Sequence, residues 1–183
     1  MKRSRTLSHM LLVMITLINV LLVWQAKAAG HAVAIDYIHG EGGVDGIKLA
    51  YQRHSDVLQR FSPLLDLYFE SSVNFWQYGD NNQHDTNFVL AISPVIQYEV
   101  SRWNHNPVLV EFGIGVSLLD DTQFAGKNVS THYQFEDRLG IVYRFGQAQQ
   151  YRVALRYLHY SNAGFKRPNP GLDFVSLSFS RHF

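Results

Sequence analysis

Residues 108–118 read VLVEFGIGVSL, and large apolar side chains occupy every second position of this stretch. The positions between them hold small or polar residues, apart from Leu109. Successive side chains of a β-strand point to opposite faces, so an alternation with a period of two predicts a strand. We expect this strand to present one apolar face and one largely polar face.

The same alternation recurs on both sides of this stretch, along most of the chain. Strong alternating runs occupy residues 88–100, 133–145, 151–157 and 175–183, and weaker runs lie near 32–40, 46–54 and 64–78. Breaks rich in glycine, proline or polar residues separate the runs at 40–46, 54–63, 79–86, 101–107, 119–131, 146–150 and 162–171. Helical periodicity is nearly absent after residue 30, so the chain predicts eight strands joined by turns and loops.

Eight long strands with one apolar and one polar face are typical of an antiparallel transmembrane β-barrel of the bacterial outer membrane. The interior of so small a barrel is filled by side chains. Charged residues that share the polar face are expected to pair there, namely Glu99, Glu111, Glu136, Arg138, Arg144, Arg152 and Arg156. A soluble β-barrel or sandwich with its apolar face inside is the alternative. The long strands and the aromatic C-terminal residue Phe183 favour the membrane barrel.

The composition is that of a single charge-poor domain without cysteine. The chain has 183 residues and a net charge of +1, and only 17% of its residues are charged, against about 25% in a typical soluble domain. The low net charge argues against nucleic acid as a partner, because nucleic-acid binders use basic patches. The absence of cysteine excludes disulfide scaffolds, thiolate zinc sites, cysteine nucleophiles and a lipidated N-terminal cysteine.

The N-terminal segment has the pattern of a secretory signal peptide. The basic stretch KRSR at 2–5 precedes an apolar stretch at 10–24, and the small-x-small sequence AKA at 26–28 follows it. The apolar stretch is shorter than the ~20 residues that a helix needs to cross a bilayer, so an uncleaved anchor is the less favoured interpretation. We expect residues 1–28 to be a cleaved signal peptide and residues 29–183 to be the outer-membrane barrel.

An even number of strands places both termini of the barrel on the same side of the membrane, the periplasm. The loop 162–171, between the last two strands, is then extracellular. An aromatic residue at the end of an alternating C-terminal strand is typical of proteins inserted into the outer membrane. We therefore expect the barrel-assembly machinery to be a partner of the chain through Phe183.

Polar residues interrupt the lipid-facing positions near this loop and form a candidate catalytic group. His159 and Ser161 share the lipid-facing side of their strand, with Cβ atoms roughly 7 Å apart. A hairpin across residues 162–171 brings Asp173, on the same face of the last strand, close to His159. Serine, histidine and carboxylate are the nucleophile, the general base and the orienting acid of serine hydrolases. The alternative is that these are ordinary polar residues at the membrane interface.

A second acid, Asp137, also lies at a lipid-facing position. A tight hairpin through residues 146–150 places it opposite His159. Asp137 is therefore a candidate to orient His159 together with Asp173 or in its place. An interfacial hydrogen bond or a β-bulge is the alternative role for this residue.

The sequence around these residues resembles a known family. The stretch HYSNAG at 159–164, followed by Lys166, by Pro168-Asn169 and by Gly171, resembles the C-terminal motif of the outer-membrane lipid A 3-O-deacylase (PagL) family. Upstream runs also resemble that family, namely SPV at 93–95, YE at 98–99, EFGIGV at 111–116 and FEDRLG at 135–140. The resemblance covers roughly residues 86–183.

The resemblance implies an eight-stranded barrel that hydrolyses the ester-linked 3-hydroxyacyl chain at the 3-position of lipid A in the outer leaflet. The family's serine and histidine fall on Ser161 and His159. Its glutamate falls on Asp173, whose carboxylate is one methylene shorter. The resemblance also places oxyanion donors on the 162–171 loop, for which Asn169 and the backbone N–H near Gly164 are the candidates.

Other residues of the loop receive expected roles as well. Asn162 points inward by parity and is expected to be structural. Lys166 and Arg167 are candidates to bind the phosphates of lipid A, with solvated loop charges as the alternative. The remaining histidines show no ligand spacing with carboxylates, so we expect neither a metal nor another cofactor.

The sequence thus predicts a serine esterase whose partners are lipid A or lipopolysaccharide and the outer-membrane bilayer. A homodimer is left open as its oligomeric state. The alternatives are a non-enzymatic small barrel with a structural or adhesive role, and a barrel phospholipase or acyltransferase that acts on another acyl group.

Overall fold

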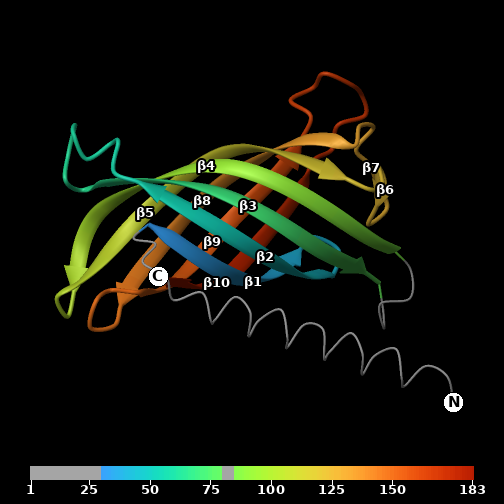
Figure 1. Cartoon of the computed structure of the whole chain (residues 1–183). Helices are drawn as coiled ribbons and strands as arrows, with labels where there is room; N and C mark the ends of the chain where they lie inside the picture. The colour runs from blue at the N-terminus through green and yellow to red at the C-terminus, as the bar shows by residue number, and fades with distance from the viewer. Residues whose placement is uncertain (1–29, 80–84) are drawn as a thin grey trace, which may run out of the picture. The chain divides into compact units, whose positions relative to one another are not determined.

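A computed structural model describes residues 30–79 and 85–183, and Figure 1 shows long strands that cross the barrel obliquely. The barrel strands are β1 (His31–Gly40), β2 (Val44–Ser55), β3 (Leu65–Tyr78), β4 (Asp85–Trp103), β5 (Asn106–Leu119), β8 (Tyr133–Phe145), β9 (Tyr151–Ser161) and β10 (Leu172–His182). Two very short strands, β6 (Gln123–Phe124) and β7 (Lys127–Asn128), form a separate hairpin after β5. The predicted signal peptide at 1–28 lies outside the described residues.

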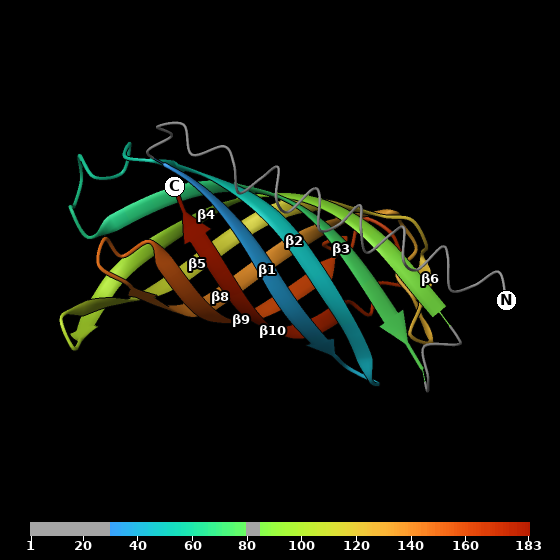
Figure 2. The ribbon, with the colours of Figure 1, turned by 60° about the horizontal axis from the view of Figure 1, so that its bottom comes forward.

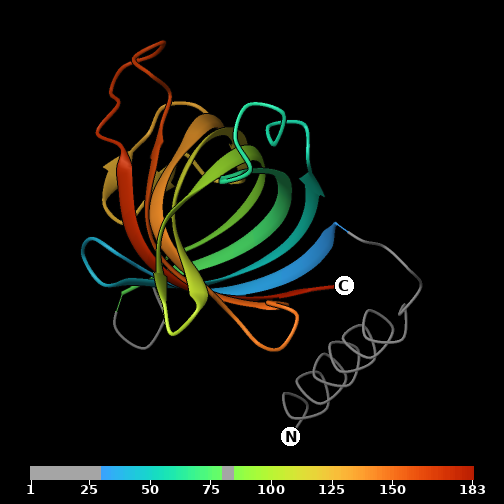
Figure 3. The same ribbon diagram turned by 90° about the vertical axis from the view of Figure 1, so that its left-hand side faces the viewer.

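The eight long strands close into one antiparallel barrel, which confirms the predicted fold class. Each strand pairs with its neighbour in the chain order, and β1 pairs with β10 to complete the ring (Figures 2 and 3). Closure matters because an open sheet edge would leave unpaired backbone groups, which a hydrocarbon environment does not tolerate. The loops 41–43, 120–132 and 162–171 all lie at the end opposite to the start of β1 and the end of β10.

The outer wall is apolar along its whole circumference, as the alternation predicts. Outward side chains such as Leu139, Ile141 and Leu155 are 57–59% exposed, whereas their inward neighbours are buried. In the described part of the chain no helix is long and apolar enough to cross a bilayer. An apolar outer face and a filled interior are the arrangement expected for strands that meet lipid.

Charged side chains fill the middle of the barrel as an ion-pair network. Arg138 Nη2 lies 2.6 Å from Glu70 Oε1 and 2.8 Å from Glu136 Oε1, and Lys48 Nζ lies 2.7 Å from Glu70 Oε1. Arg156 joins the network through further carboxylates, with Nη1 2.8 Å from Asp36 Oδ2 and Nε 2.5 Å from Glu111 Oε1. Each buried charge therefore has an opposite partner, without which its burial would be costly.

The predicted network differs from the observed one at one residue. Glu99 keeps the predicted inward face, opposite the buried Leu109, but it pairs with the exposed Arg102, 2.7 Å away, and not with the interior network. The register of β4 shifts just after this position, between Glu99 and Ser101, and Arg102 follows that shift.

An apolar plug fills the interior at the end that carries the 162–171 loop. Its buried members come from several strands and from the 120–132 loop, and they are Ile38, Val44, Trp76, Val89, Leu119, Phe124, Val129, Leu158, Tyr160, Leu172 and Phe174. Trp76 is central to this plug, with ring centroids 4.6 Å from Phe174 and 4.9 Å from Tyr160. The plug fixes the inward residues of β9 and β10, and therefore also the outward residues between them.

Candidate active site

Strand β9 holds two of the predicted site residues on the outer wall because their neighbours are anchored inside. Tyr160, which lies between His159 and Ser161, is fully buried in the plug. Its hydroxyl donates a hydrogen bond to Glu136 Oε2 at 2.7 Å. Because side chains alternate along a strand, this inward anchor forces both His159 and Ser161 outward.

Strand β10 brings the acid to the histidine by direct pairing. Asp173 and His159 are opposite each other in the β9–β10 register. His159 Nδ1 donates to Asp173 Oδ1 at 2.7 Å, and the two side chains are 32% and 26% exposed. The neighbours of Asp173, Leu172 and Phe174, are buried in the plug. The shorter acid therefore reaches the imidazole at this position.

Gly171 packs against the imidazole just before β10 begins. A Cβ at this position would lie 2.6 Å from His159 Cε1, closer than side chains approach one another. Gly171 also has a φ of +70°, which favours glycine. The loop can therefore cover the edge of the His159 ring only with glycine here.

Ser161 completes the group in position but makes no hydrogen bond to His159 within the described residues. It is half-buried at the end of β9, and its register partner on β8 is Phe135. Since Asp173 engages Nδ1 of His159, Nε2 is the nitrogen left to accept a proton from a serine hydroxyl. Hydrogen bonds between a catalytic hydroxyl and its histidine are often long when no substrate is bound.

Asp137 lies opposite His159 in the β8–β9 register, as the hairpin arithmetic predicts. It is half-buried, but in the described part of the chain no hydrogen bond joins it to His159. Of the two acids beside His159, Asp173 is the one in contact with the ring.

The 162–171 loop is organised around the side chain of Asn162, which points inward and is fully buried. Its Nδ2 donates to the carbonyls of Val129 and Lys166, and its Oδ1 accepts the N–H of Gly164 at 3.0 Å. The backbone N–H of Gly164 is thus already used. Asn169 accepts the backbone N–H of Asn162 through its Oδ1, which leaves the Nδ2 donors of Asn169 without a partner among the described residues.

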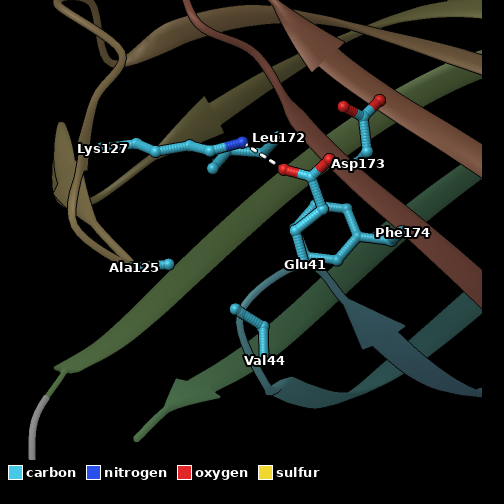
Figure 4. A pocket seen from close by; sticks show the side chains of 7 residues that line it. All are labelled: Glu41, Val44, Ala125, Lys127, Leu172, Asp173 and Phe174. Atoms are coloured by element: carbon cyan, nitrogen blue, oxygen red, sulfur yellow. Dashed lines mark hydrogen bonds and ion pairs between the residues drawn. The ribbon is translucent and has the colours of Figure 1, made fainter.

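The β6–β7 hairpin straps the loop from the side. Lys127 Nζ donates to the carbonyl of Gly171 at 3.1 Å and also pairs with the carboxylate of Glu41 from the β1–β2 turn. Figure 4 shows this pair at a small pocket that Asp173 also lines. Ser130, at the other end of the strap, donates to the carbonyl of Pro168. The 120–132 segment therefore holds the loop at two points, Gly171 and Pro168.

Two residues that contact this site were not singled out from the sequence. The hydroxyl of Tyr157 donates to Asp173 Oδ1, the same oxygen that His159 contacts. Tyr157 occupies one of the apolar positions of β9, so the sequence pattern does not single out its hydroxyl. Lys127 lies in a stretch that had the character of a turn, where no periodicity indicates which residues meet. Lys166 and Arg167, in contrast, are exposed as expected of loop charges.

The arrangement supplies the groups that acyl transfer requires. A hydroxyl, an imidazole held by a carboxylate and an unengaged amide donor lie within one loop and two adjacent strands. Within residues 30–79 and 85–183, no three histidine or carboxylate side chains are grouped to hold a metal ion.

Comparison with known proteins agrees with this geometry. A lipid A deacylase PagL of Pseudomonas aeruginosa is 30% identical over 157 residues, which cover 86% of this chain and 88% of that protein. A lipid A deacylase PagL of Bordetella bronchiseptica is 32% identical over 119 residues, which cover 65% of this chain and 64% of that protein.

A solved structure also matches the barrel. The crystal structure of the outer membrane enzyme PagL superposes with a TM-score of 0.71 at 27% identity, covering 83% of this chain and 99% of that one. The family model described as lipid A 3-O-deacylase (PagL) matches residues 45–182, a range that contains every candidate site residue. The chain therefore belongs to the lipid A 3-O-deacylase (PagL) family.

Proposed function

We propose that this outer-membrane barrel is a serine-type lipid A 3-O-deacylase. The observation that carries the proposal is the pair formed by His159 and Asp173 at 2.7 Å, with Ser161 two residues further along the same outward face. Family membership supports the substrate, and the site supports the mechanism. The C-terminal Phe183 supports delivery to the barrel-assembly machinery.

In the first half of the reaction, Ser161 Oγ attacks the carbonyl carbon of the 3-linked ester. The hydroxyl proton passes to Nε2 of His159, and Asp173 stabilises the imidazolium through Nδ1. The bond between the acyl carbon and the sugar oxygen then breaks. The departing sugar oxygen takes the proton from His159, which leaves a free 3-hydroxyl on lipid A and an acyl chain on Ser161.

In the second half, water attacks the acyl-enzyme, and the same imidazole accepts its proton. Release of the fatty acid returns that proton to Ser161 Oγ, so that the enzyme is unchanged. Both tetrahedral intermediates carry an oxyanion. The Nδ2 donors of Asn169 are proposed to bind it, because the N–H of Gly164 donates to Asn162 instead.

The position of the site on the outer wall suits an amphipathic substrate. An acyl chain of a neighbouring lipid can remain in the hydrocarbon, where the apolar outer strands meet it, while its ester reaches Ser161. Lys166 and Arg167 are exposed on the adjoining loop and are proposed to contact the phosphates.

Lipid A from a Gram-negative host that expresses the full chain tests this proposal. Mass spectra are compared for the wild type, for Ser161→Ala and for Ser71→Ala. Ser71 is an exposed serine on the outer face of β3 and gives a matched control. We expect the loss of one 3-hydroxyacyl group with the wild type and S71A, and unmodified lipid A with S161A.

The outcome is read only where each variant is present as folded barrel, which heat-modifiable migration in gels establishes. Full deacylation by folded S161A rules out the serine mechanism. Unchanged lipid A with folded wild type rules out the activity. Loss of a different acyl group from lipid A indicates a deacylase that acts at another position instead.

A further inference from the structure

Tyr157 makes a contact that the general mechanism does not use. It lies two residues before His159 on the outward face of β9, and its register partner on β10 is Val175. It is therefore a diagonal neighbour of Asp173, a separation that an aromatic side chain can span. Its hydroxyl donates to Asp173 Oδ1, so that one carboxylate oxygen accepts from both Tyr157 and His159.

The contact has a physical consequence for an acid on a membrane wall. Within the described residues, Tyr157 and His159 are the side chains that hydrogen-bond the Asp173 carboxylate. If the histidine were its single partner, the carboxylate would be free to rotate toward water whenever the imidazole moved during proton transfer. The phenol of Tyr157 is a second donor to this carboxylate, and a hydrogen bond to an anion is stronger than one between neutral groups.

The barrel contains a second copy of this arrangement, which provides an internal reference. On the adjacent β1–β2 hairpin, Tyr37 donates to Asp45 Oδ1 at 2.5 Å, and His39 Nδ1 lies 2.9 Å from the same oxygen. His39 and Asp45 are register partners, as His159 and Asp173 are. The strand geometry is therefore repeated, with tyrosine two residues before histidine in both cases.

The two copies differ in what surrounds them. Two residues after His39 the chain has Glu41, where the other copy has the nucleophile Ser161. The side chains of His39 and Asp45 are also 60% and 52% exposed, about twice as much as those of His159 and Asp173. A role for the tyrosine in catalysis is thus expected in one copy and excluded in the other.

We infer that Tyr157 is a positioning residue of the catalytic group, which holds Asp173 against His159 through its hydroxyl. The inference rests on the proposed serine mechanism. It implies that the aspartate at this position works as part of a pair with Tyr157. The hydroxyl acts on the rate of the chemical step, because it touches the acid and not the substrate.

The test compares Tyr157→Phe with Tyr37→Phe, each of which removes one phenol hydroxyl and keeps the ring. Purified barrels are assayed for kcat and KM on lipopolysaccharide in detergent. We expect Y157F to lower kcat by about ten-fold with little change in KM, as for the loss of one hydrogen bond to a charged group. Y37F is expected to match the wild type in both constants.

A double-mutant cycle separates positioning from general packing. In the background of Asp173→Asn, the orienting carboxylate is already gone, so that adding Y157F is expected to lower kcat no further. The inference is contradicted if Y157F lowers kcat by the same factor in the wild type and in D173N. It is also contradicted if the kcat of Y157F equals that of Y37F. Equal losses in Y157F and Y37F assign both tyrosines to the interfacial wall.

A second measurement keeps the inference separate from the choice of substrate. A small fluorophosphonate phosphonylates the hydroxyl of an activated serine and releases fluoride, while the proton passes to the histidine. We expect mass spectrometry to find the label on Ser161, and Y157F but not Y37F to slow labelling by about ten-fold. If labelling follows this order while lipopolysaccharide is not deacylated, the substrate assignment is wrong and the role of Tyr157 stands. If folded wild type is not labelled at Ser161, both the serine mechanism and the inference fail.

Discussion

His159 and Asp173 face each other across the β9–β10 ladder, and their side chains meet at 2.7 Å on the outer wall of the barrel. Both members of this acid–base pair therefore lie on strands, and the inward neighbours of each are buried in the plug. A distance set by strand pairing is held more rigidly than one set by a loop. Ser161, the proposed nucleophile, is the last residue of β9 and pairs in register with Phe135 of β8.

Removing the charge of Asp173 tests the role of this pair. Asp173→Asn keeps the shape of the side chain but loses the acceptor that fixes the histidine tautomer, and kcat is expected to fall by roughly 10³–10⁴. Asp45→Asn in the second tyrosine–histidine–aspartate group is the matched control and should leave deacylation unchanged. Kinetics on purified lipopolysaccharide give the comparison. A D173N enzyme with more than a tenth of the wild-type kcat would contradict the assignment.

Asp137 provides a separate comparison, because it is the other acid opposite His159. Asp137→Asn is expected to lower kcat less than D173N does, since no hydrogen bond joins it to the ring within the described residues. The same lipopolysaccharide assay measures both. A dead D137N together with an active D173N would exchange the roles of the two acids.

Gly171 is expected to tolerate no side chain. In Gly171→Ala the new Cβ must displace the His159 ring, which lies 2.6 Å from its position, and deacylation should be lost in a barrel that still folds. Gly43→Ala is the control, because Gly43 has a similar φ of +82° and open space around its Cβ position. Lipid A mass spectra and heat-modifiable migration distinguish loss of activity from loss of folding. Equal effects of both changes would show that backbone strain alone is responsible.

Lys127 is expected to support activity through the loop it straps. Lys127→Ala removes the donor to the Gly171 carbonyl, and we expect kcat to fall several-fold with the barrel folded. Glu41→Gln changes the other partner of Lys127 but leaves the contact with Gly171, so its kcat should stay close to wild type. The kcat values of the two variants on lipopolysaccharide test this expectation. If E41Q is as impaired as K127A, the ion pair and not the carbonyl contact is what matters.

Arg138 is expected to govern stability and not chemistry. Arg138→Met leaves Glu70 and Glu136 buried with Lys48 as their remaining cation, a loss of about 3–5 kcal/mol by the usual cost of an uncompensated buried charge. Urea unfolding of the barrel in detergent measures it. Arg53→Met, on the exposed face of β2, should leave the unfolding midpoint unchanged. Equal midpoints for R138M and the wild type would show that the network is dispensable.

The alternation along the chain was sufficient to predict the fold and the side of the wall on which the site lies. His159, Ser161 and Asp173 stand out because they are polar at positions where the pattern requires apolar residues. Strand pairing then determines which of them meet, and the β9–β10 register confirms the expected neighbours. Both inferences depend on short-range geometry, which a sequence expresses directly.

What the sequence did not reveal depends on contacts between segments without periodicity. Lys127 reaches Gly171 from a loop whose path follows from the plug beneath it, where Phe124 and Val129 are buried. The partner of Glu99, Arg102, was not predicted because it follows a register shift, which is invisible to a count of alternate positions. Tyr157 was overlooked for a third reason, since a tyrosine counts as apolar in the alternation although its hydroxyl donates to Asp173.

The filled interior also has a consequence for the cell that carries the protein. From the apolar plug around Trp76 to the ion pairs of Arg138, side chains occupy the described barrel where larger barrels have an aqueous channel. The proposed catalytic group lies on the outside of the cylinder, and packed side chains close its inside. A bacterium can therefore raise the copy number of this enzyme to remodel its surface without adding conductance to the permeability barrier.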